Sequence, residues 1–333
     1  MMKIGVDTES LHLWFQNGRI DIFGFIDLVY EMGFDGVMIN LLTKKNQTEG
    51  LGALGKDNPG HIREVAKYLQ ERRMFVELAT KGTDVAHIRK VLDVASILGA
   101  KTVRTYIAYP GGTANQMKNG AFDRNFFFGQ ATALRKLVPL LEEYKIDLAV
   151  ENHELETCGE MLTLLRAVGS RRVGALFDSG NPMMAWEEPV QAVHKILPYI
   201  KSTHIKDQVV CLYQNEPVIC GMPLGKGNID LGAIYHAIQT GTELDHMILE
   251  ICSPYASPFR RERGTSSVGK IGEGTFKTEP LPFAKKIAEP LDYYNYEGKY
   301  LPILLWKQYK NLQESLSYLQ QLIRLGEQWR VAA

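Results

Sequence analysis

The sequence predicts an α/β protein built as a (β/α)8 TIM barrel, and three observations point to it. Short apolar or β-branched segments alternate eight times with segments whose apolar residues recur at helical spacing. The short segments are apolar throughout, as strands covered by helices are. The chain has 333 residues, a common size for a single-domain barrel. Helical crossovers make the strands parallel, and eight units at this length favour a closed barrel over an open sheet.

The expected elements follow one another in order along the chain. The expected strands span Lys3–Asp7, Gly36–Asn40, Phe75–Ala79, Thr102–Ile107, Ile146–Val150, Val173–Phe177, Ile200–Ile205 and Met247–Ile251. The expected helices between them span Ile22–Met32, His61–Arg72, Asp84–Leu98, Asn125–Tyr144, Thr157–Val168, Pro189–Leu197 and Asp230–Thr240. The first helix illustrates the pattern, because Ile22, Phe25, Ile26 and Val29 share one helical face and Gly33 follows its end.

The segment after the eighth strand departs from the alternation. Residues Ser253 to Tyr300 lack apolar periodicity and contain several glycines and prolines. A long irregular segment inside a compact domain is typical of a lid, a binding loop or a partner contact. Leu301 to Trp329 then restores a helical pattern. We expect one TIM-barrel domain over residues 1–333, with a lid or partner-binding insertion at 253–300 and a C-terminal helix at 301–329.

Composition excludes several classes of function. Lys plus Arg equals Asp plus Glu, 38 each, so there is no electrostatic case for nucleic acid as a partner. No N-terminal signal pattern and no apolar run of about 20 residues is seen, so we expect no membrane partner. The four cysteines lack CxxC spacing and read as reduced thiols of a cytoplasmic protein.

Four consecutive strands, the fifth to the eighth, each end in one residue that can bind a metal. These residues are Glu151, Asp178, His204 and Glu250. Singly, each is more often a capping, ion-pair or structural residue. All strand C-terminal ends of a barrel open on one face, however, so four such residues in succession predict one shared metal site.

The mixed oxygen and nitrogen ligand set suits Mn²⁺, Mg²⁺, Co²⁺ or Zn²⁺, and its oxygen-rich balance favours Mn²⁺. Such a cation stabilises an enediolate or alkoxide, which acidifies a C–H bond beside a carbonyl. The same ion can instead activate water, so the ligand set alone does not fix the reaction.

Further polar residues lie beside the expected ligands. His153 lies two residues after the first of them, so a continuing strand pleat points it the same way, either as a general base or acid or as a hydrogen-bonding neighbour. Lys206 either holds a substrate oxygen or pairs with a carboxylate. Asp207 could orient an imidazole. Arg104 is expected to face the cavity and contact substrate, because a charged guanidinium is poorly accommodated against helices.

Several motifs resemble those of the xylose-isomerase-like barrel superfamily, which includes sugar epimerases, sugar-phosphate isomerases, inosose dehydratases and AP-endonuclease-like proteins. The resemblance covers roughly residues 3 to 252. Its most specific motifs are Val150–His153, Phe177–Asn181, His204–Asp207, Gly225–Asp230 and Leu249–Glu250. It implies a divalent metal, often manganese, on Glu151, Asp178, His204 and Glu250.

Within that superfamily, Asn181 stands where many ketose epimerases carry a histidine. The Glu-x-His pairing and the Asp-Ser-Gly-Asn-Pro run are more similar to the catalytic (alpha) subunits of C-glycoside deglycosidases. That resemblance implies β-elimination from a 3-oxo-glycoside, with His153 as the base, Glu151 and Glu250 as further catalytic residues and Asn181 near the substrate. It also implies a hetero-oligomer with a smaller partner subunit, which the insertion at 253–300 could contact.

We therefore expect a metal-dependent lyase acting on a sugar or glycoside. The first alternative is a sugar isomerase or epimerase that uses the same metal site. Less favoured are an AP-endonuclease-type hydrolase, which the balanced charge opposes, and a non-catalytic barrel subunit.

Overall fold

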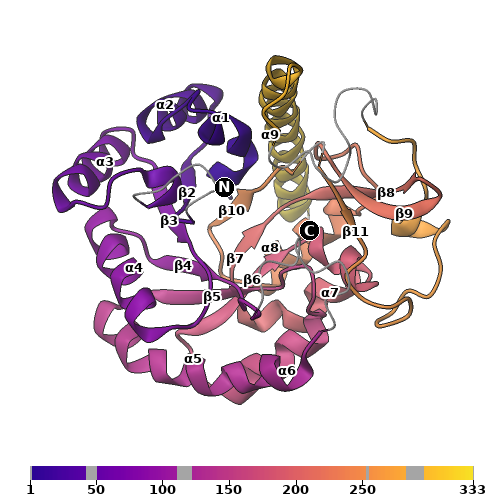
Figure 1. The fold of residues 1–333 in the computed structure, drawn as a ribbon, viewed down its shortest axis with the longest axis horizontal. Coiled ribbons are helices and arrows are strands. Elements are labelled where there is room, and N and C mark those ends of the chain that lie inside the picture. Colours follow the sequence, from indigo (N-terminus) through magenta and orange to yellow (C-terminus); the bar gives the residue numbers. More distant parts are fainter. Residues whose placement is uncertain (1, 43–50, 111–121, 253–254, 283–295, 333) are drawn as a thin grey trace.

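Eight parallel strands form the barrel in this computed structural model of the chain (Figure 1), which confirms the predicted fold class. The structure describes residues 2–42, 51–110, 122–252, 255–282 and 296–332. The barrel strands are β1 (Lys3–Asp7), β2 (Gly36–Asn40), β3 (Phe75–Ala79), β4 (Thr102–Thr105), β5 (Asp147–Glu151), β6 (Val173–Asp178), β7 (Ile200–His204) and β10 (His246–Leu249). Their order is β10-β1-β2-β3-β4-β5-β6-β7. The barrel closes where the Ile205 N–H donates to the Ile248 carbonyl at 2.8 Å.

Helices surround the barrel, as the alternation predicts (Figure 1). They are α2 (Ile22–Met32), α3 (Pro59–Glu71), α4 (Val85–Leu98), α5 (Arg124–Tyr144), α6 (Cys158–Val168), α7 (Pro189–Ile196) and α8 (Leu231–Gly241), with a short α1 (His12–Gln16) after β1. Helix α2 shows how the sequence sets such an element. The Asp21 carboxylate caps its first turn by accepting from the Gly24 N–H at 2.8 Å, and Gly33 ends it in a left-handed conformation.

Side chains fill the barrel interior in layers. Met38, Ala79, Ala149, Leu176 and Ile248, one from each of five strands, form a buried apolar cluster. Each lies at the end of its strand or within two residues of it, so the next inward positions open on the C-terminal mouth. The apolar layer therefore forms the floor beneath the strand ends that carry the expected metal ligands.

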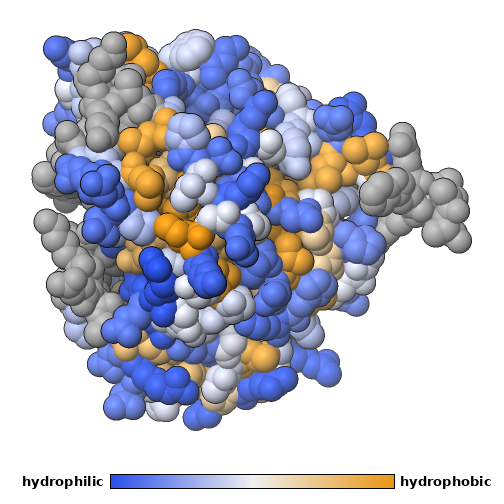
Figure 2. Space-filling model, turned by 90° about the vertical axis from the view of Figure 1, so that its right-hand side faces the viewer, coloured by the Kyte–Doolittle hydropathy of each residue, from blue (hydrophilic) through white to orange (hydrophobic). Residues whose placement is uncertain are grey.

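A second sheet, which the sequence did not predict, stands beside the barrel (Figure 1). It is antiparallel and contains β8 (Asp207–Tyr213), β9 (Glu216–Met222) and β11 (Ala256–Pro258), in the order β11-β9-β8. The last of these strands belongs to the segment expected as an irregular insertion. Figure 2 views the molecule from the side of this sheet, where hydrophobic residues are interspersed with hydrophilic ones.

The described part of the insertion packs on the barrel mouth. Trp186, at the end of a short 3-10 helix after β6, stacks on Phe259 with ring centroids 4.0 Å apart. Arg261 donates to the Leu155 carbonyl at 2.8 Å and to the Glu160 carboxylate at 3.1 Å. The insertion is thus attached to the loops that follow β5 and β6.

The C-terminal helix α9 (Leu301–Ala332) joins the two ends of the chain. Its residues Leu301 and Leu304 pack against Leu13 of α1, and the Trp14 indole N–H donates to the Leu305 carbonyl at 3.1 Å. Among the helices that the structure describes, none combines the length and the apolar character that crossing a membrane requires.

Candidate metal centre

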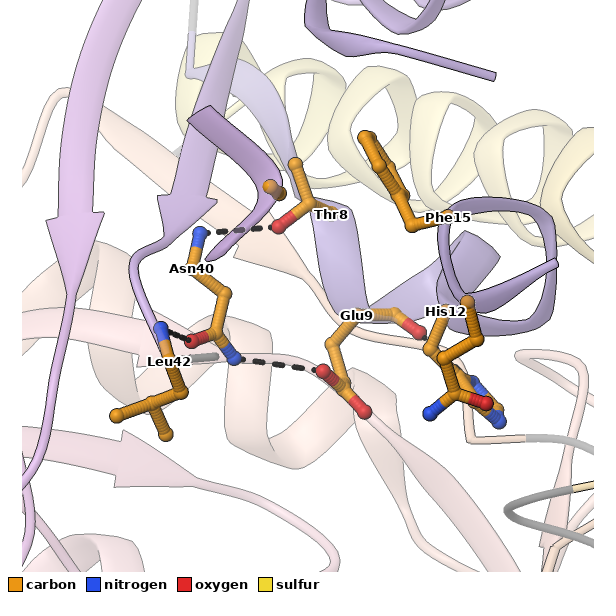
Figure 3. Close-up of a pocket in the computed structure, with 8 residues that line it drawn as sticks. Thr8, Glu9, His12, Phe15, Asn40 and Leu42 are labelled. Atoms are coloured by element: carbon orange, nitrogen blue, oxygen red, sulfur yellow. Dashed lines mark hydrogen bonds between the residues drawn. The ribbon is translucent and has the colours of Figure 1, made fainter. Parts of the chain in front are cut away.

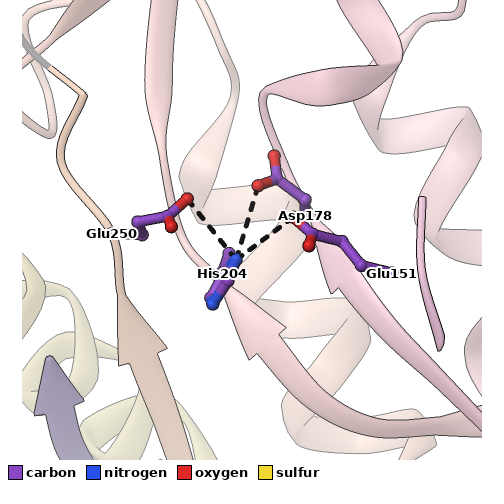
Figure 4. Close-up of side chains that lie close together, drawn as sticks. All are labelled: Glu151, Asp178, His204 and Glu250. Atoms are coloured by element: carbon purple, nitrogen blue, oxygen red, sulfur yellow. Dashed lines mark hydrogen bonds and ion pairs between the residues drawn. The ribbon is translucent and has the colours of Figure 1, made fainter. Parts of the chain in front are cut away.

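The four expected ligands converge on one point at the C-terminal mouth of the barrel (Figure 4). Glu151, Asp178 and His204 are the last residues of β5, β6 and β7, and Glu250 directly follows β10. One ligand atom from each lies within 4.8 Å of the ligand atoms of the other three, and all four residues are buried. Strand geometry explains this, because inward-facing residues recur at every second position and the strand ends share one level.

The imidazole of His204 lies among the carboxylates (Figure 4). Its Nδ1 is 3.2 Å from Glu151 Oε1, 3.4 Å from Glu250 Oε2 and 3.8 Å from Asp178 Oδ2. Its Nε2 is 3.3 Å from Asp7 Oδ2. Burial opposes a charge on the ring, but the carboxylates of Glu250 and Glu151 outweigh it and raise the pKa of His204 to about 10. Without another cation, the cluster therefore holds a proton on this imidazole.

The donor set fits a divalent cation. Four carboxylates, those of Asp7, Glu151, Asp178 and Glu250, meet the two cationic side chains Arg104 and Lys206, so formal charge leaves an excess of two negative charges. The Oδ2 atoms of Asp7 and Asp178 are buried, and the first lies 3.3 Å from His204 Nε2 and the second 2.9 Å from Lys206 Nζ, so both face a positive or protonatable group. Buried carboxylate oxygens of this kind are stabilised by a cation, and three carboxylates with one imidazole suit a first-row divalent metal.

The three residues expected to contact substrate contact the cluster's own carboxylates in this structure. Arg104 donates through its guanidinium to Glu151 and to the Thr80 carbonyl, and it holds the pKa of Glu151 well below its usual range against the effect of burial. Asn181 Nδ2 donates to Glu151 Oε1 at 3.3 Å. Lys206 pairs with Asp178 at 2.9 Å and also with Glu250.

His153 lies beside the cluster without being one of the four grouped residues. Its ring stacks on Tyr106, with centroids 4.2 Å apart and planes at 13°. Its backbone N–H donates to Glu156 Oε2 at 3.1 Å. Burial lowers the pKa of His153, which favours the neutral imidazole. A neutral imidazole in a fixed orientation next to a cation site is chemically suited to accept a proton.

Asp207 lies at a different kind of position from the one we expected. Its carboxylate accepts backbone N–H bonds from Gly225 and Gly227 at 2.9 Å and from Ile229 at 3.2 Å. A Cβ on Gly227 would come within 2.1 Å of Asp207 Oδ1, so only glycine allows this approach. Asp207 therefore fixes the 225–229 loop that leads into α8, a role different from the orientation of an imidazole that the sequence left open for it.

Sequence reasoning missed Asp7 and Tyr106 as members of the site. Asp7 ends β1 just as the four expected ligands end or follow their strands, so the same strand-end pattern could have found it. Tyr106 follows Arg104 by two positions, and strand alternation places both on the cavity side. The Arg104 guanidinium lies 4.7 Å from the Tyr106 ring centroid.

Comparisons with known proteins agree with the barrel fold. The family model described as "Xylose isomerase-like TIM barrel" matches residues 75–267. The 3-oxo-isoapionate decarboxylase of Pectobacterium atrosepticum is 24% identical over 257 residues, 76% of this chain and 87% of that protein. A solved L-ribulose 3-epimerase aligns with a TM-score of 0.62 and 14% identity, covering 100% of this chain and 98% of that one. The IOLI protein with a binding zinc atom aligns with a TM-score of 0.57 and 17% identity, covering 76% and 90%.

Proposed function

The chain belongs to the family of xylose isomerase-like TIM barrels, and we propose that it is a divalent-metal-dependent enzyme that removes a proton from the carbon next to a keto-sugar carbonyl. Glu151, Asp178, His204 and Glu250 are the proposed ligands, and Mn²⁺ is the preferred ion because three of the four donors are carboxylate oxygens. When bound, the cation stabilises the negative charge that develops on the carbonyl oxygen.

We choose between the possible reactions by asking which residue can accept the substrate proton, and His153 is the residue best placed to do so. Arg104 lowers the pKa of Glu151, and His204 and then Lys206 lower the pKa of Glu250, in each case against the effect of burial. Each carboxylate is therefore a weak base. The imidazole of His153 is neutral and is held by its stack on Tyr106. We propose that His153 accepts the substrate proton, while Glu151 and Glu250 complete the catalytic centre.

The favoured outcome is β-elimination from a 3-oxo-glycoside, as in the C-glycoside deglycosidases that the motifs resemble. His153 takes the proton from C2, beside the C3 ketone. The electron pair of that bond forms the C1=C2 double bond, and the C1–aglycone bond breaks. The aglycone leaves with the electron pair and is then protonated. Arg104, Lys206 and Asn181 border the cluster and are the proposed contacts for the sugar oxygens next to the ketone.

Release of the aglycone tests this proposal. Metal-loaded protein is incubated in D₂O with a 3-oxo-glucoside, and free aglycone and deuterium at C2 are followed by chromatography and NMR. Elimination predicts free aglycone, with none from the parent glucoside that lacks the ketone. A protein that neither releases aglycone nor exchanges the C2 proton, while holding stoichiometric metal, contradicts the proposed proton abstraction.

Isomerisation or epimerisation is the second candidate. Glu151 and Glu250 come from β5 and from the end of β10 and approach His204 Nδ1 from two directions (Figure 4). Epimerisation needs proton-transfer groups on two faces of the substrate carbon, and two flanking carboxylates offer them. A new keto-sugar with an intact aglycone bond in the same experiment identifies this reaction.

The resemblance to deglycosidase subunits also suggests a smaller partner subunit, with the 253–300 insertion as its contact or as a lid. The described part of that insertion contacts the loop beside the site. Arg260 forms a buried ion pair at 3.0 Å with Glu154, the residue that follows His153 in the chain. Size-exclusion chromatography coupled to light scattering, with the protein purified from its native host, tests whether such a subunit is retained.

A further inference from the structure

A pocket of polar side chains lies at the C-terminal ends of β1 and β2, on the same mouth as the metal centre (Figure 3). Glu9, His12, Gln16 and Asn40 are the polar residues that line it together with Thr8. Asn40 Nδ2 donates to Glu9 Oε2 at 3.3 Å. The free space is about 10 Å³, which is close to the room that a single water molecule or hydroxyl group requires.

This pocket begins next to the four-ligand cluster. Asp7, whose carboxylate faces His204 at 3.3 Å, directly precedes Thr8 and Glu9 in the chain. Thr8 Oγ1 accepts from the Asn40 backbone N–H at 3.0 Å, which joins β1 to β2 at this level. A sugar whose carbonyl lies at the cluster would therefore extend along the mouth towards Glu9.

The C-terminal helix contacts His12, one of the residues that line the pocket. Gln308 of α9 is 1% exposed, and its Nε2 lies 3.1 Å from His12 Nδ1. Among the residues that line the pocket, Gln16 has a buried Nε2 with no hydrogen-bond partner among the described residues. An amide N–H of this kind can donate to a hydroxyl group, and the imidazole of His12 can also form a hydrogen bond with one.

We propose that this pocket binds an uncharged hydroxyl group of the substrate, remote from its carbonyl, and that Gln308 positions His12 for this contact. The inference rests on the proposed keto-sugar chemistry and adds the substrate class: an unphosphorylated sugar. A phosphate is much larger than the free space, and the described residues lining the pocket include the carboxylate of Glu9 and no lysine or arginine.

Calorimetry with a graded series of hydroxyketones tests the proposal. The metal-loaded protein is titrated with dihydroxyacetone, L-erythrulose, D-xylulose, D-fructose and D-fructose 6-phosphate. Dihydroxyacetone carries only the carbonyl end. We expect the best of the longer ketoses to bind about tenfold more tightly than dihydroxyacetone, the gain of one or two hydrogen bonds, and the phosphate ester to bind at least about tenfold more weakly than D-fructose.

Replacing Gln308, the positioning residue, should remove only the extra affinity that the longer ketoses have over dihydroxyacetone. In Gln308→Leu the affinity for the best ketose falls to about that of dihydroxyacetone, whose own affinity stays unchanged. Gln321→Leu, on the exposed face of the same helix, leaves both affinities unchanged. Gln16→Leu, which changes the pocket from α1, gives the same loss and serves if the Gln308 variant does not fold.

The possible outcomes separate this inference from the proposed function. If dihydroxyacetone binds as tightly as every longer ketose, or if the phosphate ester binds best, the hydroxyl pocket is wrong while the metal-dependent keto-sugar chemistry stands. If metal-loaded protein binds no hydroxyketone but acts on the 3-oxo-glucoside, the hydroxyl pocket is wrong and the proposed function stands. If it binds no hydroxyketone and neither releases aglycone from the 3-oxo-glucoside nor exchanges its C2 proton, the proposed function itself fails and the inference fails with it.

Discussion

His204 has a carboxylate against each of its ring nitrogens, Asp7 on one side and Glu151 with Glu250 on the other. Its raised pKa shows how the cluster balances its excess negative charge when no other cation is present. A metal ligand must be deprotonated at the donor atom, so metal binding here releases a proton from the imidazole. Removing one of the carboxylates weakens the attraction of the cluster both for a proton on His204 and for a metal ion.

Glu250→Ala should abolish tight metal binding and activity together. Loss of one of four protein ligands costs about 3 kcal/mol, roughly a 100-fold loss of affinity, which elemental analysis after dialysis will show as metal-free protein. The exposed Glu243→Ala is the matched control and should keep its metal. Stoichiometric metal in dialysed Glu250→Ala would remove Glu250 from the ligand set.

His153→Ala should retain the metal and lose turnover. His153 is outside the group of four, and a general base contributes about 10²–10⁴ in rate, so kcat should fall by that factor. Metal content and the rate of proton exchange at the substrate carbon are measured on the same sample, with the exposed His236→Ala as control. If the metal is lost together with the activity, His153 is a ligand or a structural residue and another group is the base.

At the scale of one element, the loop from β5 to α6 holds a buried carboxyl group. Glu156 is 2% exposed, accepts from the Tyr109 hydroxyl at 3.0 Å and from the His153 N–H at 3.1 Å, and burial raises its pKa to about 8. Between pH 4.5 and pH 8 the unfolded chain has lost this proton while the folded protein retains it. The free energy of unfolding therefore falls by about 5 kcal/mol in total as the pH rises from 4.5 to 8. Above pH 8 the ionisation of Glu156 causes no further change in stability.

Glu156→Gln should remove that pH dependence, because a glutamine amide resembles the protonated carboxyl and has no proton to lose. We expect the variant to match the parent protein near pH 4.5 and to exceed its stability by up to about 5 kcal/mol at pH 9, as measured by urea denaturation at both pH values. Exposed Glu143→Gln should follow the parent at both. A Glu156→Gln protein that loses stability in parallel with the parent would show that the folded protein holds Glu156 ionised.

The barrel elements could be predicted from sequence because each carries a strong local pattern, whereas the β8–β9 hairpin could not. Its two-residue turn consists of Gln214 and Asn215, with φ of 52° and 67°. Two-residue hairpin turns are normally recognised in a sequence by Asn-Gly or Asp-Gly. Gln-Asn is not one of these sequences, so the turn could not be recognised. The short β11 pairs with β9 across more than 30 intervening residues, a long-range contact that no local pattern encodes.

The candidate site likewise combines features that the sequence predicts with features that only the folded structure shows. The convergence of Glu151, Asp178, His204 and Glu250 follows from strand position alone. The pairing of Arg104 with Glu151 and of Lys206 with Asp178 depends on how far side chains reach between neighbouring strands. For Lys206 the sequence left both substrate contact and carboxylate pairing open. Gln308 lies 296 positions from His12, so only the folded chain reveals their contact.

At the scale of the whole molecule, the cation should stabilise the fold. A ligand that binds only the folded state at 100 times its Kd adds about 2.7 kcal/mol, which for a chain of this length raises Tm by roughly 4 °C. Differential scanning calorimetry of the protein with Mn²⁺ and with EDTA measures this shift. Glu250→Ala should show no such shift. An equal rise in Tm for both proteins would place the stabilising ion elsewhere.

The barrel is closed by its last strand, since β10 pairs with β1, and α9 then packs on α1, the first helix of the chain. These contacts join residues separated by more than 240 positions, so a growing chain on the ribosome cannot form them until more than 240 residues beyond β1 have been synthesised. Glu250 and Gln308 are also among the last site residues to emerge. A truncated translation product therefore has an open barrel edge and an incomplete centre, which makes it a substrate for chaperones and proteases but not an active enzyme.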